Sequence, residues 1–117
     1  MLGKIAAVCF VVLATQLGAE EVWFCQGESL YAMEAPERKM TSYKPQNFKF
    51  TIYDSEKVVF GSGGWFSDTE YIITEYLGDT FWAYNDNKVI VMDEGKLNHA
   101  YVDFDTIVTV TATCDKF

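Results

Sequence analysis

Histidine is scarce in this chain, which holds only His99 among its 117 residues. A histidine beside a nucleophile is the most frequent general base of small hydrolases. No serine lies near His99 in the sequence, and a lone histidine on a strand is more often a surface or packed residue. The sequence therefore offers no histidine-based catalytic set, and we expect a protein that is not an enzyme and holds no cofactor.

Positive charge is also scarce, because nine Lys and Arg residues face 17 Asp and Glu residues, for a net charge of −8. Binding to nucleic acid or to an anionic membrane surface requires clustered Lys and Arg, so neither partner is expected. The acidic balance suits a cationic partner instead. One segment, residues 37–49, reverses the balance with four basic residues against Glu37. We interpret it as a solvated loop rather than a binding patch.

Long hydrophobic runs are absent. The longest, Ile5 to Ala14, is about half the length that a membrane-spanning helix needs. It follows Lys4 and precedes the small pair Gly18 and Ala19, which is the layout of a secretory signal peptide. We predict a signal peptide over residues 1–19, with cleavage after Ala14 as the alternative site, no stable membrane anchor, and export to the periplasm or the extracellular space. One β-domain over residues 20–117 follows, and the loss of Lys4 makes its net charge −9.

Cysteines are few as well. Cys9 leaves with the predicted signal peptide, so Cys25 and Cys114 remain. Two thiols in an oxidising compartment tend to pair, and two cysteines allow one intramolecular connectivity. A redox or metal pair usually needs close spacing or extra ligands, and this sequence supplies neither. We therefore predict a structural disulfide between Cys25 and Cys114.

What the chain does have is a regular series of turn signals, about ten residues apart from position 54 onward. Short segments rich in Val, Ile, Thr and aromatic residues lie between them. This spacing predicts an all-β protein: a small antiparallel meander barrel of about seven or eight strands, or a sandwich. The turn segments are YDSEK, GSGG, FSDTE, LGD, NDNK and DEGK.

Alternating side chains indicate which faces are buried. Phe48, Phe50 and Ile52 share one face of a strand, and Val108, Val110, Ala112 and Cys114 share one face of the last strand. Trp23 and Cys25 likewise face one way in EVWFCQG. We predict that the first and last strands are neighbours joined by the disulfide, which would close the sheet and protect its edges. Closure favours a barrel, although cysteines on facing sheets of a sandwich would also pair.

Residues 27–39, GESLYAMEAPERK, fit two structures. Ser29 could cap a short helix that ends at Pro36. The same stretch could be a strand in which Leu30 and Ala32 alternate with Tyr31 and Met33. We favour a strand over residues 28–35, since an obvious strand precedes it directly.

Three pairs of carboxylates are spaced by two residues, and each pair shares a face if its segment is extended. They are Asp54 with Glu56, Asp68 with Glu70, and Asp103 with Asp105. A glycosidase needs two carboxyl groups in one cleft, whereas these residues flank turns, where Asp is favoured. The acidic turns at 85–87 and 93–95 could offer oxygen ligands to calcium, but the twelve-residue calcium-loop pattern is missing, and we expect no metal site.

Aromatic residues are abundant, and 18 of the 19 lie after residue 19. In FWAY, Phe81 falls on one face while Trp82 and Tyr84 fall on the other, and both faces of one small barrel cannot be core. Trp65 and Phe66 follow the glycine-rich turn GSGG. We predict a contact surface formed by Trp65, Phe66, Trp82 and Tyr84; cross-strand stabilisation of the sheet is the alternative role for the outward aromatics.

The layout of a signal peptide, an acidic β-domain and a cysteine near each end is similar to that of the small periplasmic inhibitors of c-type lysozyme. GSGGW at 61–65 loosely resembles the Ser-Gly-containing loop of that family. The resemblance implies an eight-stranded barrel that binds a cationic enzyme. It transfers no functional residue to this chain.

The prediction from sequence is thus an exported, non-enzymatic binding module that recognises a protein or a component of the cell envelope, such as a glycan. The alternatives are a small carboxylate-dependent hydrolase acting on carbohydrate, a lysozyme-inhibitor-like barrel that binds a cationic enzyme, and a barrel that holds a small apolar ligand in an internal cavity.

Overall fold

The computed structural model describes residues 20–62 and 64–117, which form nine β-strands. The predicted signal peptide, residues 1–19, lies outside the described residues. No helix within the described ranges is long and apolar enough to cross a membrane. The strands are β1 (Glu20–Glu34), β2 (Lys39–Tyr43), β3 (Phe48–Tyr53), β4 (Lys57–Phe60), β5 (Glu70–Tyr76), β6 (Thr80–Asn85), β7 (Lys88–Asp93), β8 (Lys96–Val102) and β9 (Thr106–Lys116).

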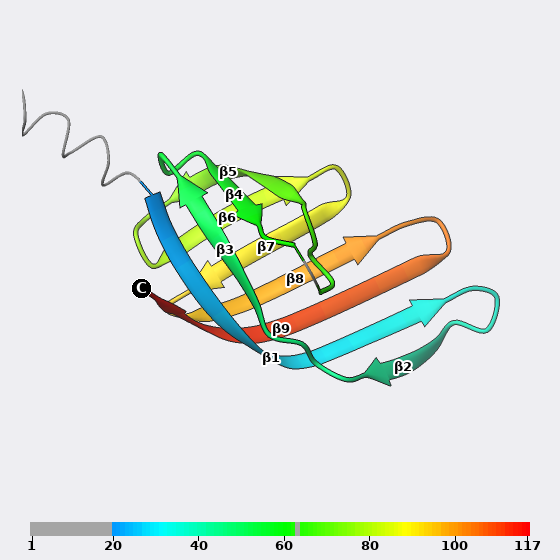
Figure 1. The fold of residues 1–117 in the computed structure, drawn as a ribbon. Helices are drawn as coiled ribbons and strands as arrows, with labels where there is room; N and C mark the ends of the chain where they lie inside the picture. Colours follow the sequence, from blue (N-terminus) through cyan, green and yellow to red (C-terminus); the bar gives the residue numbers. More distant parts are fainter. Residues whose placement is uncertain (1–19, 63) are drawn as a thin grey trace, which may run out of the picture.

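Eight of these strands close into an antiparallel barrel, as the turn spacing predicts. From β3 to β9 each strand pairs with the next, and β9 then pairs with β1, which also pairs with β3. The last strand therefore meets the first, and the closed wall leaves no edge among these eight strands. The ninth strand, β2, lies outside the barrel wall and pairs with β1 (Figure 1).

The strand β1 is long, and along one side it pairs with two different strands in succession. Its first part pairs with β3 and its last part, from Leu30 to Glu34, pairs with β2, while β9 follows it along most of its length. The predicted strand over residues 28–35 is thus confirmed in its main part. The segment that connects β2 to β3 crosses β1 at Gly27, where a Cβ would lie 2.3 Å from the carbonyl oxygen of Gln46. Glycine is needed here because the two backbones approach so closely.

The turns adopt the backbone conformations that their residues favour. Asp86 in the β6–β7 turn and Glu94 with Gly95 in the β7–β8 turn have positive φ angles. Asp54 and Ser55 do the same between β3 and β4. Asp and Asn tolerate this region better than most residues, so the NDNK and YDSEK segments act as hairpin turns.

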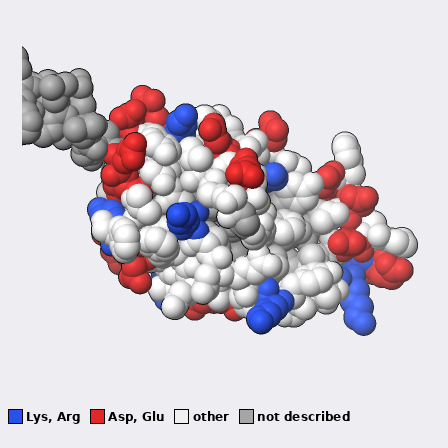
Figure 2. Space-filling model, in the orientation of Figure 1, with Lys and Arg blue, Asp and Glu red and all other residues white. Residues whose placement is uncertain are grey.

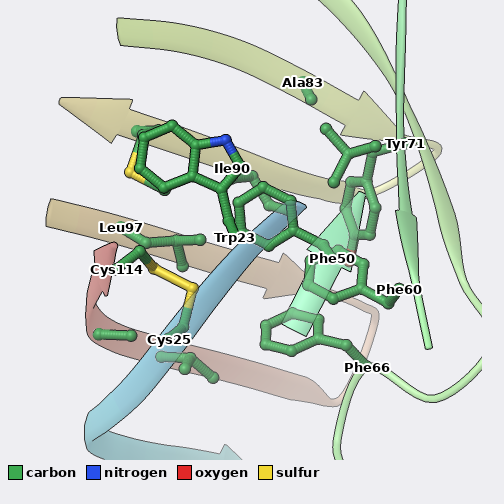
Figure 3. Close-up of a cluster of buried hydrophobic side chains, with 14 of the residues drawn as sticks. Trp23, Cys25, Phe50, Phe60, Phe66, Tyr71, Ala83, Ile90, Leu97 and Cys114 are labelled. Carbon is green, nitrogen blue, oxygen red and sulfur yellow. A yellow bond between two sulfur atoms is a disulfide. The ribbon is translucent and has the colours of Figure 1, made fainter. Parts of the chain in front are cut away.

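Large side chains fill the interior of the barrel. Phe50, Tyr71 and Phe81 are almost fully buried, and the rings of Phe60 and Phe66 stack with centroids 4.4 Å apart (Figure 3). The inward residues predicted from alternation are confirmed, since Phe50 and Ile52 on β3 and the inward face of β9 are buried. Because aromatic rings occupy the interior, the fold does not depend on the outward aromatics for its core.

The disulfide between Cys25 and Cys114 joins β1 to β9 and confirms the predicted pairing. The two residues are direct register partners with Cα atoms 4.0 Å apart, and both are buried. The backbone N–H of Cys114 donates to the carbonyl of Gly95, away from β1, so the cysteines form a non-hydrogen-bonded pair, where side chains approach most closely. The N–H of Phe117 donates to Val22, which holds the C-terminus on β1. A disulfide of this kind suggests an oxidising compartment.

Candidate functional site

An apolar patch lies on the outer wall of the barrel, across β5, β6 and β7. Trp82 and Tyr84 point outward from β6 with 49% and 47% of their surface exposed. Tyr84 is the register partner of Ile72 on β5 and of Val89 on β7, and Trp82 pairs with Val91. These five residues are therefore neighbours on one face, and we call them the outer-wall patch. Aromatic residues at such a surface favour protein contacts.

The other two predicted contact residues, Trp65 and Phe66, differ in exposure. Trp65 is 47% exposed at the end of the barrel. The prediction that Phe66 lies on a contact surface is wrong, because its side chain is 2% exposed and packs against Phe48, Phe60 and His99. Phe66 comes from the loop between β4 and β5, and its ring lies beside Phe60 in the cluster of buried side chains (Figure 3). Adjacent residues in a loop need not share a face, so alternation could not decide between them.

Phe66 lies between two hollows at this end of the barrel. The larger one, of about 590 Å³, has an aromatic floor of Phe48, Phe60 and Phe66. Its polar lining is contributed by Gln26, Asn47, Lys49, Ser62 and Asp115. This combination of apolar floor and few polar groups is common in small-molecule sites. Its size is within the range of such sites, although the groove is open to solvent.

The second hollow, of about 290 Å³, is lined by Trp65, Phe66, Tyr71, Lys88 and His99, among others. At its base the Tyr71 hydroxyl and the Nε2 atom of His99 are 2.8 Å apart and share a hydrogen bond. Burial, and secondarily the positive charge of Lys88, lower the pKa of His99 to about 4. Burial likewise raises the pKa of Tyr71. Both side chains are therefore neutral at pH 7.

This buried pair was not predicted from sequence. The alternation in KLNHAYV places His99 on the same face as Leu97, which is also buried, and that signal could have identified His99 as an inward residue. Nothing in the sequence pairs it with Tyr71, 28 positions away, because only closure of the barrel brings β5 and β8 to one interior.

The three carboxylate pairs lie on three different turns. Asp54 and Glu56 belong to the β3–β4 turn, and Asp103 and Asp105 to the β8–β9 turn. Asp68 lies in the loop before β5, and Glu70 is the first residue of that strand. All six carboxylate side chains are exposed. The hydrogen bond from the Tyr101 hydroxyl lowers the pKa of Asp103, which keeps that carboxylate ionised.

The two acidic turns considered for calcium lie at opposite ends of β7, since β7 runs from Lys88 to Asp93 between them. An extended strand of that length separates its ends by about 15–20 Å, so the two turns cannot share one ion. No group of three His, Cys, Asp or Glu residues with the geometry of a metal site occurs within residues 20–62 and 64–117.

The basic segment 37–49 is only partly the solvated loop expected from its charge, since Lys39–Tyr43 form β2 and Phe48 begins β3. Lys39 opens β2, and Lys44 follows its last residue. Every residue of β2 is exposed. The segment then crosses β1 and enters β3, where Lys49 lines the larger hollow at the barrel end, apart from the three basic residues on or beside β2.

Comparison of this chain with protein families, with curated proteins and with solved structures finds no match.

Proposed function

We propose that this protein is an exported, non-enzymatic binding module that recognises a protein or a cell-envelope component through the outer-wall patch. The observation that carries the proposal is the exposure of Trp82 and Tyr84 beside Ile72 on a barrel whose interior is already filled. Half-exposed aromatics in a contiguous apolar patch are unfavourable in water unless a partner covers them.

The charge and the disulfide support the same proposal. A net charge of −8 favours association with a cationic protein by long-range attraction, and Glu75 lies beside Trp82 in the ladder. The disulfide suits a protein that works in the periplasm or outside the cell, where thiols are oxidised.

The test compares the protein with a Trp82→Ala/Tyr84→Ala variant. Each is immobilised and exposed to envelope extract, retained proteins and glycans are identified, and the affinity of the main one is measured by calorimetry. Loss of two central aromatics typically costs at least 2 kcal/mol, so we expect binding to weaken by about 30-fold or more. Leu77→Ala/Phe104→Ala is the matched control, because it removes two exposed apolar side chains from turns outside the patch.

The proposal fails if no partner is retained, or if the patch variant binds the retained partner as well as the unchanged protein does. Melting temperatures of both variants should stay within a few degrees of the parent, since the altered side chains are about half-exposed or more. That measurement separates lost binding from lost folding.

A second candidate, an inhibitor of a cationic lysozyme-like enzyme, is favoured by the closed eight-stranded barrel together with the acidic charge. Inhibition of a c-type lysozyme at low salt, relieved at high salt, would support it. The carboxylate-dependent hydrolase has no such support, because its candidate pairs lie on three separate turns.

A further inference from the structure

The strand β2 presents the open edge of an otherwise closed sheet. In the sheet that the described residues form, β2 stands last in the strand order and pairs with β1 alone. One side of β2 therefore offers backbone N–H and C=O groups from alternate residues to a further strand. Such an edge is the surface that β-strand addition uses to capture an extended peptide.

This edge carries positive charge on a protein that is otherwise acidic. Arg38, Lys39 and Lys44 lie on or directly beside β2, and residues 38–47 contain no carboxylate, in a chain of net charge −8. The register partner of Lys39 on the β1 side is Glu34. Figure 2 shows basic side chains projecting at the lower right margin, where Figure 1 places β2. Acidic groups gather above them at the right-hand end of the molecule, where Figure 1 places the β1–β2 and β8–β9 turns (Figure 2). The charge at the edge thus complements a strand that bears carboxylates.

A row of apolar side chains crosses the outer face of β8, β9, β1 and β2 and ends at the same edge. Register pairing aligns Val102 of β8, Ile107 of β9, Met33 of β1 and Met40 of β2 across four strands. Val102 and Met40 are about half-exposed, at 53% and 49%. A strand added beside β2 would place one side chain next to Met40 and lengthen the row, so an apolar residue is favoured there.

The two faces of β2 then specify a pattern. Met40 and Ser42 point to the outer face, whereas Lys39, Thr41 and Tyr43 share the opposite face, as alternation along a strand requires. An added strand with apolar residues on the outer face and carboxylates on the other would match Met40 and Lys39 together.

We propose that the free edge of β2 binds an extended segment of a partner protein in which acidic and apolar residues alternate. Charge argues against a second copy of this chain as the occupant. Pairing two β2 strands would bring Arg38, Lys39 and Lys44 of both copies to one junction, and like charges across a strand pair are destabilising. This edge lies apart from the outer-wall patch on β5–β7, so the proposal does not depend on the function proposed above.

The test uses a fluorescent hexapeptide of alternating Glu and Val as the probe and measures its binding to the disulfide-bonded protein by anisotropy. Amide exchange followed by NMR locates the site. Two control peptides test the contributions of charge and of alternation separately. The first alternates Lys and Val, which reverses the charge. The second has the composition of the probe with the three Glu residues grouped, which removes the alternation. We expect the probe to bind, amides of β2 to become protected, and both controls to bind at least tenfold more weakly.

Two variants sharpen the test. Lys39→Glu/Lys44→Glu should weaken probe binding by about tenfold or more, with a smaller difference at high salt. Thr41→Pro and Ser42→Pro are compared with each other, because successive N–H groups along a strand point to opposite edges. Only one of them removes an N–H from the free edge, and that one should abolish binding while leaving the pairing with β1 intact.

Three outcomes would overturn the proposal. They are equal binding of the alternating and grouped peptides, protection of amides elsewhere but not in β2, and probe binding that charge reversal leaves unchanged. Sedimentation tests the competing occupant, since a concentration-dependent dimer that Ser42→Pro and Thr41→Pro affect unequally would assign the edge to a second copy.

Discussion

Reduction of the Cys25–Cys114 disulfide should remove a large share of the stability of this barrel. The bond joins residues 89 positions apart, so in the reduced protein the unfolded chain regains nearly all of its freedom. The chain-entropy relation gives roughly 4–5 kcal/mol for a loop of this length. A domain of about this size has a total stability of the order of 5–15 kcal/mol, so the loss is a substantial fraction.

The assay is urea unfolding of the same purified protein, with and without a thiol reductant, followed by tryptophan fluorescence. With a denaturant dependence of about 1.5 kcal/mol per molar urea, the loss corresponds to a midpoint lower by about 3 M. The use of one sequence in two redox states excludes effects of substitution. Cys25→Ala/Cys114→Ala should lose at least as much, because both sulfur atoms are buried and their removal also leaves space in the core.

The reasoning is refuted if the midpoint of the reduced protein lies within about 0.5 M of the oxidised one, which corresponds to less than about 1 kcal/mol. That result would mean that the pairing of β1 with β9 alone closes the barrel. Mass spectrometry of native material that shows two free thiols would also remove the support that the disulfide gives to the expectation of export.

Two further predictions concern buried groups. Because the pKa of His99 is lowered to about 4 in the folded protein, the unfolded chain binds its proton more readily between pH 4 and 6.5. The contribution of neutral His99 to the free energy of unfolding should therefore be fully present above about pH 6.5. That free energy should fall by about 3 kcal/mol as the pH is lowered toward 4. Urea titrations across this window should show the fall in the parent and in Tyr71→Phe, and a shallower slope in His99→Leu/Tyr71→Phe; equal slopes in all three would contradict the assignment. Gly27→Ala should lower the melting temperature by several degrees, because its Cβ would lie 2.3 Å from the Gln46 carbonyl, whereas Gly61→Ala, whose Cβ meets only the Lys49 side chain at 3.5 Å, should have little effect. Similar melting curves for the two alanine variants would show that the β2–β3 connection can move away from β1.

The two surfaces proposed for binding differ in how far the sequence indicated them. Alternation in FWAY placed Trp82 and Tyr84 on the face opposite Phe81, and the structure shows that Phe81 and Ala83 are the buried ones. The edge of β2 could not be foreseen, because KMTSY has no buried residue and therefore no alternation of apolar and polar positions to reveal a strand.

The amino-acid sequence alone determined the strand spacing, the inward faces of β3 and β9, and the one pairing available to Cys25 and Cys114. These features depend on turn propensity, on the two-residue period of a strand and on a count of thiols, all of which are local or combinatorial. Only the tertiary structure decided that Phe66 is buried beside exposed Trp65, that Tyr71 meets His99, and that β2 is left with a free edge. Those outcomes depend on which distant segments the closing barrel brings together, and no local pattern specifies that geometry.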